Sequence, residues 1–179
     1  NISFVGTIFN NSTISAKTIT KGNSVILTGK ATGGTAPYTY AYYYKKTSDK
    51  SWKTAKDWSS TTSVSIKPAY ATTYDICIKV KDSNGKIAKK YFTVSVKNAP
   101  LANNSTVSKT TITKGSSVTL TGSATGGTAP YTYAYYYKKT SDKSWKTAKD
   151  WSSSTSVSIK PAYATTYDIC IKVKDSNGK

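Results

Sequence analysis

Alternation of apolar and polar residues over short stretches predicts β-strands along this chain. Val25, Leu27 and Gly29 share one face of a strand that follows a Lys-Gly turn. A loop rich in glycine and proline, residues 32–37, separates it from a tyrosine-rich strand, residues 38–44, in which the even-numbered tyrosines share a face. No stretch shows a helical period, so we expect an all-β fold.

The clearest alternation covers residues 73–96 and predicts a β-hairpin. Asn84-Gly85 is the strongest short-range signal for its turn, and the strand after the turn directs Phe92, Val94 and Val96 inward. In the strand before the turn, the inward side chains are Tyr74, Ile76, Ile78 and Val80, and the outward ones are Asp75, Cys77, Lys79 and Lys81. About seven short strands at such spacing describe an immunoglobulin-like β-sandwich.

The chain contains an internal repeat, because residues 13–86 recur almost unchanged as residues 106–179. The copies differ at the pairs Ile14/Val107, Ala16/Lys109, Lys17/Thr110, Asn23/Ser116, Ile26/Thr119, Lys30/Ser123 and Thr61/Ser154. Each copy is long enough to be a domain with its own core, so we expect a tandem array cut from a longer protein. The expected parts are an N-terminal segment or linker from a preceding unit at 1–12, repeat 1 at 13–97, a linker at 98–105, and repeat 2 at 106–179, which lacks a counterpart of the final strand.

The chain is strongly basic, with a formal net charge of +18. All 26 basic residues are lysine and all eight acidic residues are aspartate. Lysine lacks the bidentate fork of arginine, and no nucleic-acid motif is present, so specific nucleic-acid binding is not expected. A basic exterior favours contact with anionic cell-wall polymer or with sialylated and sulfated mucus, and these contacts would weaken with salt.

Each copy carries one cysteine, Cys77 or Cys170, so a disulfide within a copy is impossible. Pairing between the copies would need equivalent positions of consecutive domains to meet, so we expect free thiols. Without histidine or glutamate the sequence has no base to activate a nucleophile, no paired carboxylates and no metal-binding cluster. We therefore expect no enzyme, no cofactor and no metal site.

Several aromatic and basic residues are candidates for ligand binding. Two interpretations remain open for Tyr43, Trp52 and Trp58, which either form a binding patch or belong to the core, whereas Tyr40, Tyr42 and Tyr74 are expected in the core. The tip that begins at Lys45-Lys46 is either a solvated loop or part of the site. The candidate residues are Tyr43, Lys45, Lys46, Trp52 and Trp58, with Tyr136, Trp145 and Trp151 in the second copy.

The order of these features resembles PKD-like and triple-tyrosine immunoglobulin-like repeats of Gram-positive bacterial cell-surface proteins. The segments that carry the resemblance are 24–28, 33–34, 37–40, 73–76, 80–85 and 92–96. It spans nearly the whole repeat, but residues 45–48 replace the Gly-Asp-Gly that PKD repeats often have there. The resemblance implies tandem immunoglobulin-like (PKD or fibronectin-III-like) β-sandwiches displayed outside the cell, on a bacterial surface or secreted, for spacing and adhesion. It implies no single ligand and no catalytic residue.

Three functions remain open. The first is a non-catalytic extracellular surface-protein repeat for adhesion, display or host-factor binding, in which repetition multiplies weak contacts. The second is a dedicated immunoglobulin-binding, superantigen-like repeat, and the third is a carbohydrate-binding module of a glycan-degrading enzyme. The partner would be a host glycoprotein, an immunoglobulin or an anionic polymer. Self-association by strand completion is also open, with residues 2–5 or 8–9 as donors for the missing strand.

Overall fold

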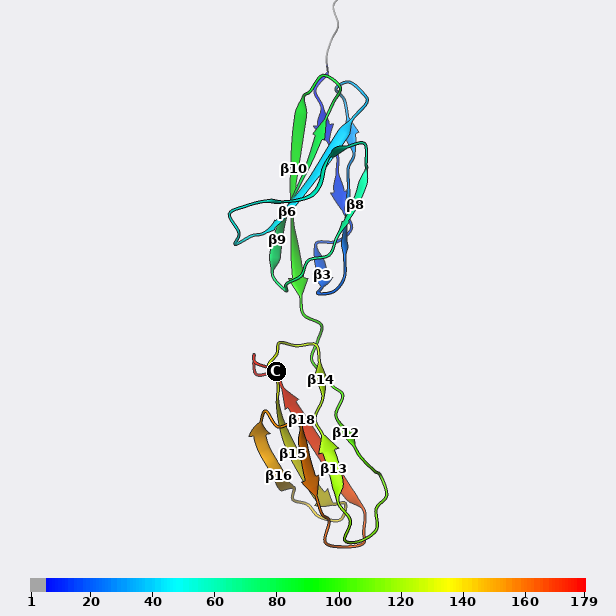
Figure 1. Cartoon of the computed structure of the whole chain (residues 1–179), viewed down its shortest axis with the longest axis vertical. Coiled ribbons are helices and arrows are strands. Elements are labelled where there is room, and N and C mark those ends of the chain that lie inside the picture. Colours follow the sequence, from blue (N-terminus) through cyan, green and yellow to red (C-terminus); the bar gives the residue numbers. More distant parts are fainter. Residues whose placement is uncertain (1–5) are drawn as a thin grey trace, which may run out of the picture. The chain divides into compact units, whose positions relative to one another are not determined.

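The computed structural model describes residues 6–179, so the strand donor considered at residues 2–5 lies outside the described residues. The chain forms two compact units, the first ending at Lys97 and the second beginning at Asn98 (Figure 1). The described residues form only strands, turns and loops, which confirms the predicted all-β fold. No helix long and apolar enough to cross a membrane occurs in this part of the chain.

The first unit is an immunoglobulin-like sandwich of two main sheets. The five-stranded sheet has the order β3-β10-β9-β6-β7, the three-stranded sheet has the order β2-β4-β8, and β1 pairs with β5. The strands are β1 (Phe9–Asn10), β2 (Thr13–Ile14), β3 (Thr18–Thr20), β4 (Val25–Thr28), β5 (Ala31–Thr32), β6 (Thr39–Lys46), β7 (Lys53–Ser59), β8 (Ser63–Ile66), β9 (Thr73–Lys81) and β10 (Ile87–Lys97).

The core of the first unit lies between these two sheets, because each sheet turns its alternate apolar side chains toward the other. Tyr42 is fully buried, and its hydroxyl donates a 2.8 Å hydrogen bond to the carbonyl oxygen of Thr61. The sequence predicted the inward positions of β4, β6, β9 and β10 correctly. Their buried members are Val25, Leu27, Tyr40, Tyr42, Tyr74, Ile76, Ile78, Val80, Val94 and Val96.

Glycine is required where the backbone comes close to this core. A Cβ atom at Gly29 would lie 2.5 Å from both Tyr40 Cδ1 and the Tyr42 hydroxyl, so a side chain there would displace the tyrosine strand. Gly33 and Gly34, in the loop that leads to β6, have positive φ angles of 68° and 59°, a conformation that glycine adopts at little cost. The predicted loop at residues 32–37 therefore has a specific backbone shape.

Residues 8–10 pack within the first unit, although they lie in the stretch 1–12 that the sequence suggested as an N-terminal segment or linker from a preceding unit. Ile8 is 8% exposed and joins the core, and Phe9 lies in β1, which pairs with β5. The side-chain amide of Asn10 donates to the carbonyl oxygens of Ile78 and Ala88. Residues 8–9 thus occupy a place in their own unit in this structure.

The second unit repeats most of this arrangement. Its sheets have the orders β16-β15-β18, β12-β13-β17 and β11-β14. Its beginning also differs from the expected linker at 98–105, because the Asn103 side chain donates to the carbonyl oxygen of Ile171. The strands are β11 (Ala102–Asn103), β12 (Thr106–Val107), β13 (Val118–Thr121), β14 (Ala124–Thr125), β15 (Thr132–Lys139), β16 (Lys146–Ser152), β17 (Ser156–Ile159) and β18 (Tyr167–Lys174).

One sheet of the second unit is smaller because the described chain has no counterpart of β10 there. In the first unit β3 pairs in parallel with β10, over Ser95 to Lys97. The equivalent residues 111–113 of the second unit form no strand. A groove of about 760 Å³ lies beside them and beside β18, lined partly by Ile112, Val118 and Ile169. β3 is thus a strand only where β10 supplies its backbone partners.

Candidate functional site

The outer face of the five-stranded sheet, which points away from the core, collects most of the predicted site residues. We use this name for the outward side chains of β6, β7, β9 and β10 together with Trp52. The register places Tyr43 beside Cys77, and Cys77 beside Tyr91, on three adjacent strands. Alternation along each strand then puts Lys45 and Lys79 on the same face. Residues as far apart in sequence as Tyr43 and Tyr91 therefore form one surface.

Lysine side chains lie over the aromatic rings of this face. The Nζ atom of Lys79 is 4.5 Å from the ring centre of Tyr43, and that of Lys81 is 4.2 Å from the ring centre of Trp58. Lys45 Nζ lies 5.5 Å from the ring centre of Trp52. All three distances are within the roughly 6 Å at which a cation is attracted to an aromatic ring. The face therefore presents flat apolar rings and positive charge together.

The second unit has the same three pairs. Lys172 lies 5.1 Å from the Tyr136 ring centre, and Lys174 lies 4.5 Å from the Trp151 ring centre. Lys138 Nζ is 5.5 Å from the centre of the Trp145 ring. Thus the candidate residues of both copies take part in equivalent contacts, although the sheet of the second unit is smaller. We call this surface of β15, β16 and β18 the second outer face.

Lys46 does not belong to the outer face. It pairs with Tyr74, whose side chain points into the core, so alternation directs Lys46 to the opposite side at the end of β6. Its Nζ atom lies 4.3 Å from the ring centre of Tyr70. Tyr70 therefore lies with Lys46 at the end of β6 and not on the outer face.

Cys77 points to the outer face as predicted, but it is not exposed. It is 3% exposed because Tyr43 and Tyr91 flank it on the neighbouring strands. Burial raises the pKa of the Cys77 thiol. A hydrogen bond with Tyr91 and the charges of nearby lysines lower this pKa, but their effects are smaller. Cys170 has only Tyr136 as such a neighbour and is half-buried. Both cysteines are free thiols in the structure.

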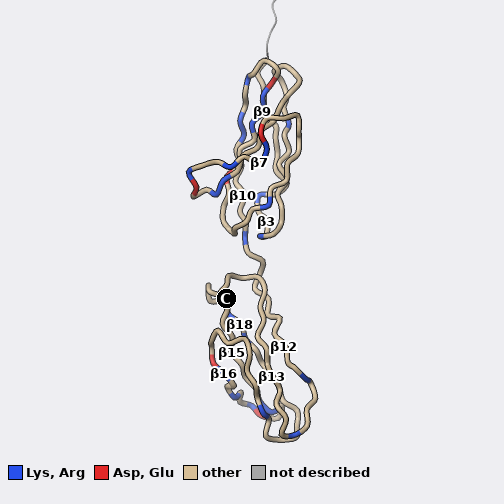
Figure 2. Tube along the Cα trace, viewed as in Figure 1, with Lys and Arg blue, Asp and Glu red and all other residues tan. Residues whose placement is uncertain are grey.

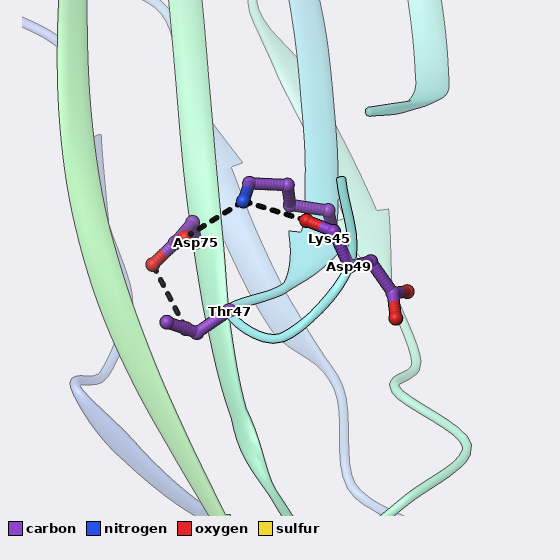
Figure 3. A network of polar contacts seen from close by, with 4 residues as sticks. All are labelled: Lys45, Thr47, Asp49 and Asp75. Carbon is purple, nitrogen blue, oxygen red and sulfur yellow. Dashed lines mark hydrogen bonds and ion pairs between the residues drawn. The ribbon is translucent and has the colours of Figure 1, made fainter. Parts of the chain in front are cut away.

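A polar network fixes the loop that carries Trp52 (Figure 3). Lys45 Nζ lies 3.5 Å from Asp75 Oδ2 and donates to the carbonyl oxygen of Asp49 at 2.9 Å. The hydroxyl of Thr47 donates to Asp75 Oδ1 at 2.9 Å. These contacts tie the tip of the β6–β7 hairpin to β9, while Thr47, Ser48 and Lys50 remain exposed to solvent.

Tyr91 is the residue of this face that the sequence analysis missed. It is 61% exposed, and its ring centre lies 6.2 Å from that of Trp52 with an interplanar angle of 48°. The Cys77 thiol and slight burial raise the pKa of its hydroxyl, so the phenol stays neutral. The sequence could have identified Tyr91, because the Asn84-Gly85 turn sets the hairpin register that places Tyr91 opposite Cys77.

The charge of the two units is mostly positive and is spread over both strands and loops (Figure 2). Burial, followed by the nearby Asp57 carboxylate, raises the pKa of Tyr43, so its hydroxyl also remains neutral. Within residues 6–179, no group of three or more His, Cys, Asp or Glu side chains is placed to hold a metal ion. The chemistry that the face offers is therefore stacking, hydrogen bonding and attraction of anions.

No protein family and no curated protein sequence matches this chain. Its architecture is similar to that of solved tandem-domain structures at low identity. The chicken CNTN1 FN1–FN3 domains are 14% identical with a TM-score of 0.34, and the match covers 92% of this chain and 61% of that chain. The fibronectin(III)-like modules of Clostridium thermocellum CbhA are 11% identical with a TM-score of 0.37, and the match covers 96% of this chain and 87% of that chain. Domains A168–A170 of titin are 16% identical with a TM-score of 0.35, and the match covers 96% of this chain and 62% of that chain. The chain thus spans less than two thirds of the first and third of these chains.

Proposed function

We propose that this chain is a non-catalytic extracellular surface-protein repeat that acts in adhesion and display. Its two outer faces hold an anionic polysaccharide by weak contacts that repetition multiplies. The observation that carries this proposal is the recurrence of the same lysine–aromatic pairs in both units. Lys79 with Tyr43 and Lys81 with Trp58 are matched by Lys172 with Tyr136 and Lys174 with Trp151.

The charge distribution supports an anionic ligand. In the described residues, the only ion pairs are Lys45 with Asp75 and Lys138 with Asp168, which leaves the other lysines without an acidic partner. The positive field of a chain with net charge +18 draws polyanions to the surface. The rings beneath the lysines add apolar area against which the C–H faces of sugar rings pack.

The test compares binding of hyaluronan, an acidic polysaccharide, with binding of neutral dextran. In the test variant, Lys79, Lys81, Lys172 and Lys174 are replaced by glutamine. The control variant carries the same change at exposed lysines outside the outer faces, Lys21, Lys67, Lys114 and Lys160. Both variants have the same net charge, so the comparison separates the outer faces from the charge of the whole chain.

We expect hyaluronan to bind at physiological salt, to weaken with added salt, and to lose about tenfold in affinity in the face variant but much less in the control. Equal losses in the two variants would show that charge alone attracts the polymer, and the outer faces would then not be the site. If hyaluronan does not bind the unmodified chain, the proposal fails.

A further inference from the structure

We propose that the groove between Trp52 and Tyr91 in the first unit binds one acidic sugar ring, a pyranose that carries a carboxylate or a sulfate. This deepens the proposed function and rests on it, because it names the part of the polysaccharide that one outer face selects. The groove measures about 450 Å³ and is lined by Lys17, Trp52, Asp75, Tyr91, Phe92 and Thr93. This volume lies within the roughly 300–1,000 Å³ of small-molecule sites.

The two rings of the groove suit a sugar. Trp52 is 40% exposed and Tyr91 is 61% exposed, so both rings have a free surface. Their centres are 6.2 Å apart and their planes are tilted by 48°, which forms an open angle rather than a closed stack. Such rings offer broad apolar contact at small entropic cost, and the hydroxyl of Tyr91 adds a polar group at the rim.

The polar residues of the groove explain why the sugar should be acidic. The exposed Lys17 makes no ion pair in the described part of the chain, so its ammonium group is available to an anion. Asp75 is the one acid in the groove, and Lys45 already offsets its charge at 3.5 Å. A carboxylate has about four acceptor positions, so Asp75 can still accept a hydrogen bond from a sugar hydroxyl.

The groove is also held in shape before a ligand arrives. Thr47 and Lys45 connect the β6–β7 hairpin tip to Asp75, and this connection positions Trp52 near Tyr91. The cation of Lys45 lies over the Trp52 ring and further restricts it. A preorganised groove loses less side-chain entropy on binding than two free aromatic side chains would.

The described part of the second unit has no counterpart of Tyr91, so this unit serves as an internal control. Trp145 has the same local sequence as Trp52 and the same lysine, Lys138, over its ring. However, Tyr91 belongs to the stretch 87–97 that the second copy does not include, and Thr110 stands in place of Lys17. Replacing Trp145 therefore measures how much an outer-face tryptophan without a neighbouring tyrosine contributes to sugar binding.

The experiment measures binding of hyaluronan and chondroitin sulfate hexasaccharides by titration calorimetry, with neutral chitohexaose as the comparison. The variants are Trp52→Ala, Tyr91→Ala, Lys17→Thr and the matched control Trp145→Ala. We expect at least one acidic hexasaccharide to bind and chitohexaose to bind at least about fivefold more weakly. Trp52→Ala and Tyr91→Ala should each weaken acidic-hexasaccharide binding by about fivefold or more, and Trp145→Ala, which removes an outer-face tryptophan without a groove, should weaken it clearly less. Lys17→Thr should reduce the preference for acidic over neutral sugar.

Circular dichroism and the thermal midpoint of each variant show whether the fold is retained. We expect it to be retained because all four side chains are exposed. Equal effects of Trp52→Ala and Trp145→Ala, or equal binding of acidic and neutral sugars, would overturn the groove proposal. If polymeric hyaluronan binds through the lysines of the outer faces while neither acidic hexasaccharide binds, the groove proposal alone fails. If the polymer does not bind at all, the proposed function fails with it.

Discussion

The two cysteines show how one missing neighbour changes a side chain at the residue scale. Cys77 and Cys170 lie in identical local sequences, but Tyr91 covers only Cys77. The thiolate is the reactive form of cysteine, so both poor access and a raised pKa protect Cys77. We therefore expect the same local sequence to show two different thiol reactivities.

We predict that iodoacetamide at pH 8 alkylates Cys170 faster than Cys77 in the folded chain. The measurement is a time course followed by mass spectrometry, in which Thr61 or Ser154 tells the otherwise similar peptides apart. In denaturant the two rates should become equal. Tyr91→Ala should speed the reaction of Cys77, and faster alkylation of Cys77 in the unmodified chain would contradict the assigned burial.

Tyr42 provides the second prediction at this scale. Its buried hydroxyl satisfies the carbonyl oxygen of Thr61, so Tyr42→Phe should leave that oxygen unpaired and cost about 1–3 kcal/mol of unfolding free energy. Chemical denaturation of the variant measures this loss. The exposed Tyr70→Phe is the control, and we expect it to leave stability nearly unchanged.

The ionisation of Tyr42 should also make the stability of the folded chain depend on pH in the alkaline range. Burial raises its pKa from 10.0 to about 12. Between these values the unfolded state loses the proton while the folded state keeps it, so the stability present below pH 10 is lost as pH rises toward 12. The alkaline decline should be smaller in Tyr42→Phe than in the unmodified chain. Parallel declines would show that Tyr42 does not contribute to it.

At the scale of elements, β10 has the largest effect on its neighbours. It pairs with β9 along nine residue pairs from Ile87 to Ser95, and it gives β3 its parallel partner. It also supplies Val94 and Val96 to the core. The second unit shows what remains without such a strand, namely an unpartnered long edge of β18 within the described chain and a groove beside it.

We predict that adding the sequence of residues 87–97 after Lys179 stabilises the second unit. Burial of each large apolar side chain contributes about 1.5–3 kcal/mol, and the ordering of the new strand offsets part of this gain. Denaturation of the extended chain measures the increase, and alkylation of Cys170 should slow at the same time. An extension with lysine at the positions of Val94 and Val96 should do neither, and equal effects of both extensions would refute the equivalence of the two units.

At the scale of the whole molecule, repetition should matter more than any one contact. An exposed lysine–aromatic pair contributes only about 0.5–1 kcal/mol. Two linked faces make the second contact intramolecular, which raises the overall affinity for a long polymer that reaches both. A short oligosaccharide that reaches one face gains nothing from the second.

We therefore predict that removing one face weakens binding of long hyaluronan more than binding of a hexasaccharide. The variant Lys172→Gln plus Lys174→Gln removes the second outer face and leaves the groove of the first unit unchanged. Surface plasmon resonance should show a severalfold loss for the polymer, smaller than the loss in the four-lysine variant, and little change for the hexasaccharide. Equal losses for both ligands would indicate that the faces do not act together.

The repeat, the β-strands and the inward set of side chains could all be read from the sequence. These features depend on short-range order, since alternation assigns faces to β4, β6 and β9 without knowledge of their partners. The aromatic and lysine candidates were also named from the sequence, which left open whether Tyr43, Trp52 and Trp58 belong to the core or to a binding patch. The local pattern thus determined which side chains of each strand face inward and which face outward.

Tertiary structure decided which of those surfaces meet. Cys77 is buried because Tyr91 arrives beside it from the next strand, and the groove forms because a hairpin tip brings Trp52 to the same place. Ile8 belongs to the core because the segment before the repeat pairs with β5. Each outcome depends on contact between residues distant in sequence, and β3 shows the physical reason most directly. The same residues form a strand only where another strand completes their hydrogen bonds.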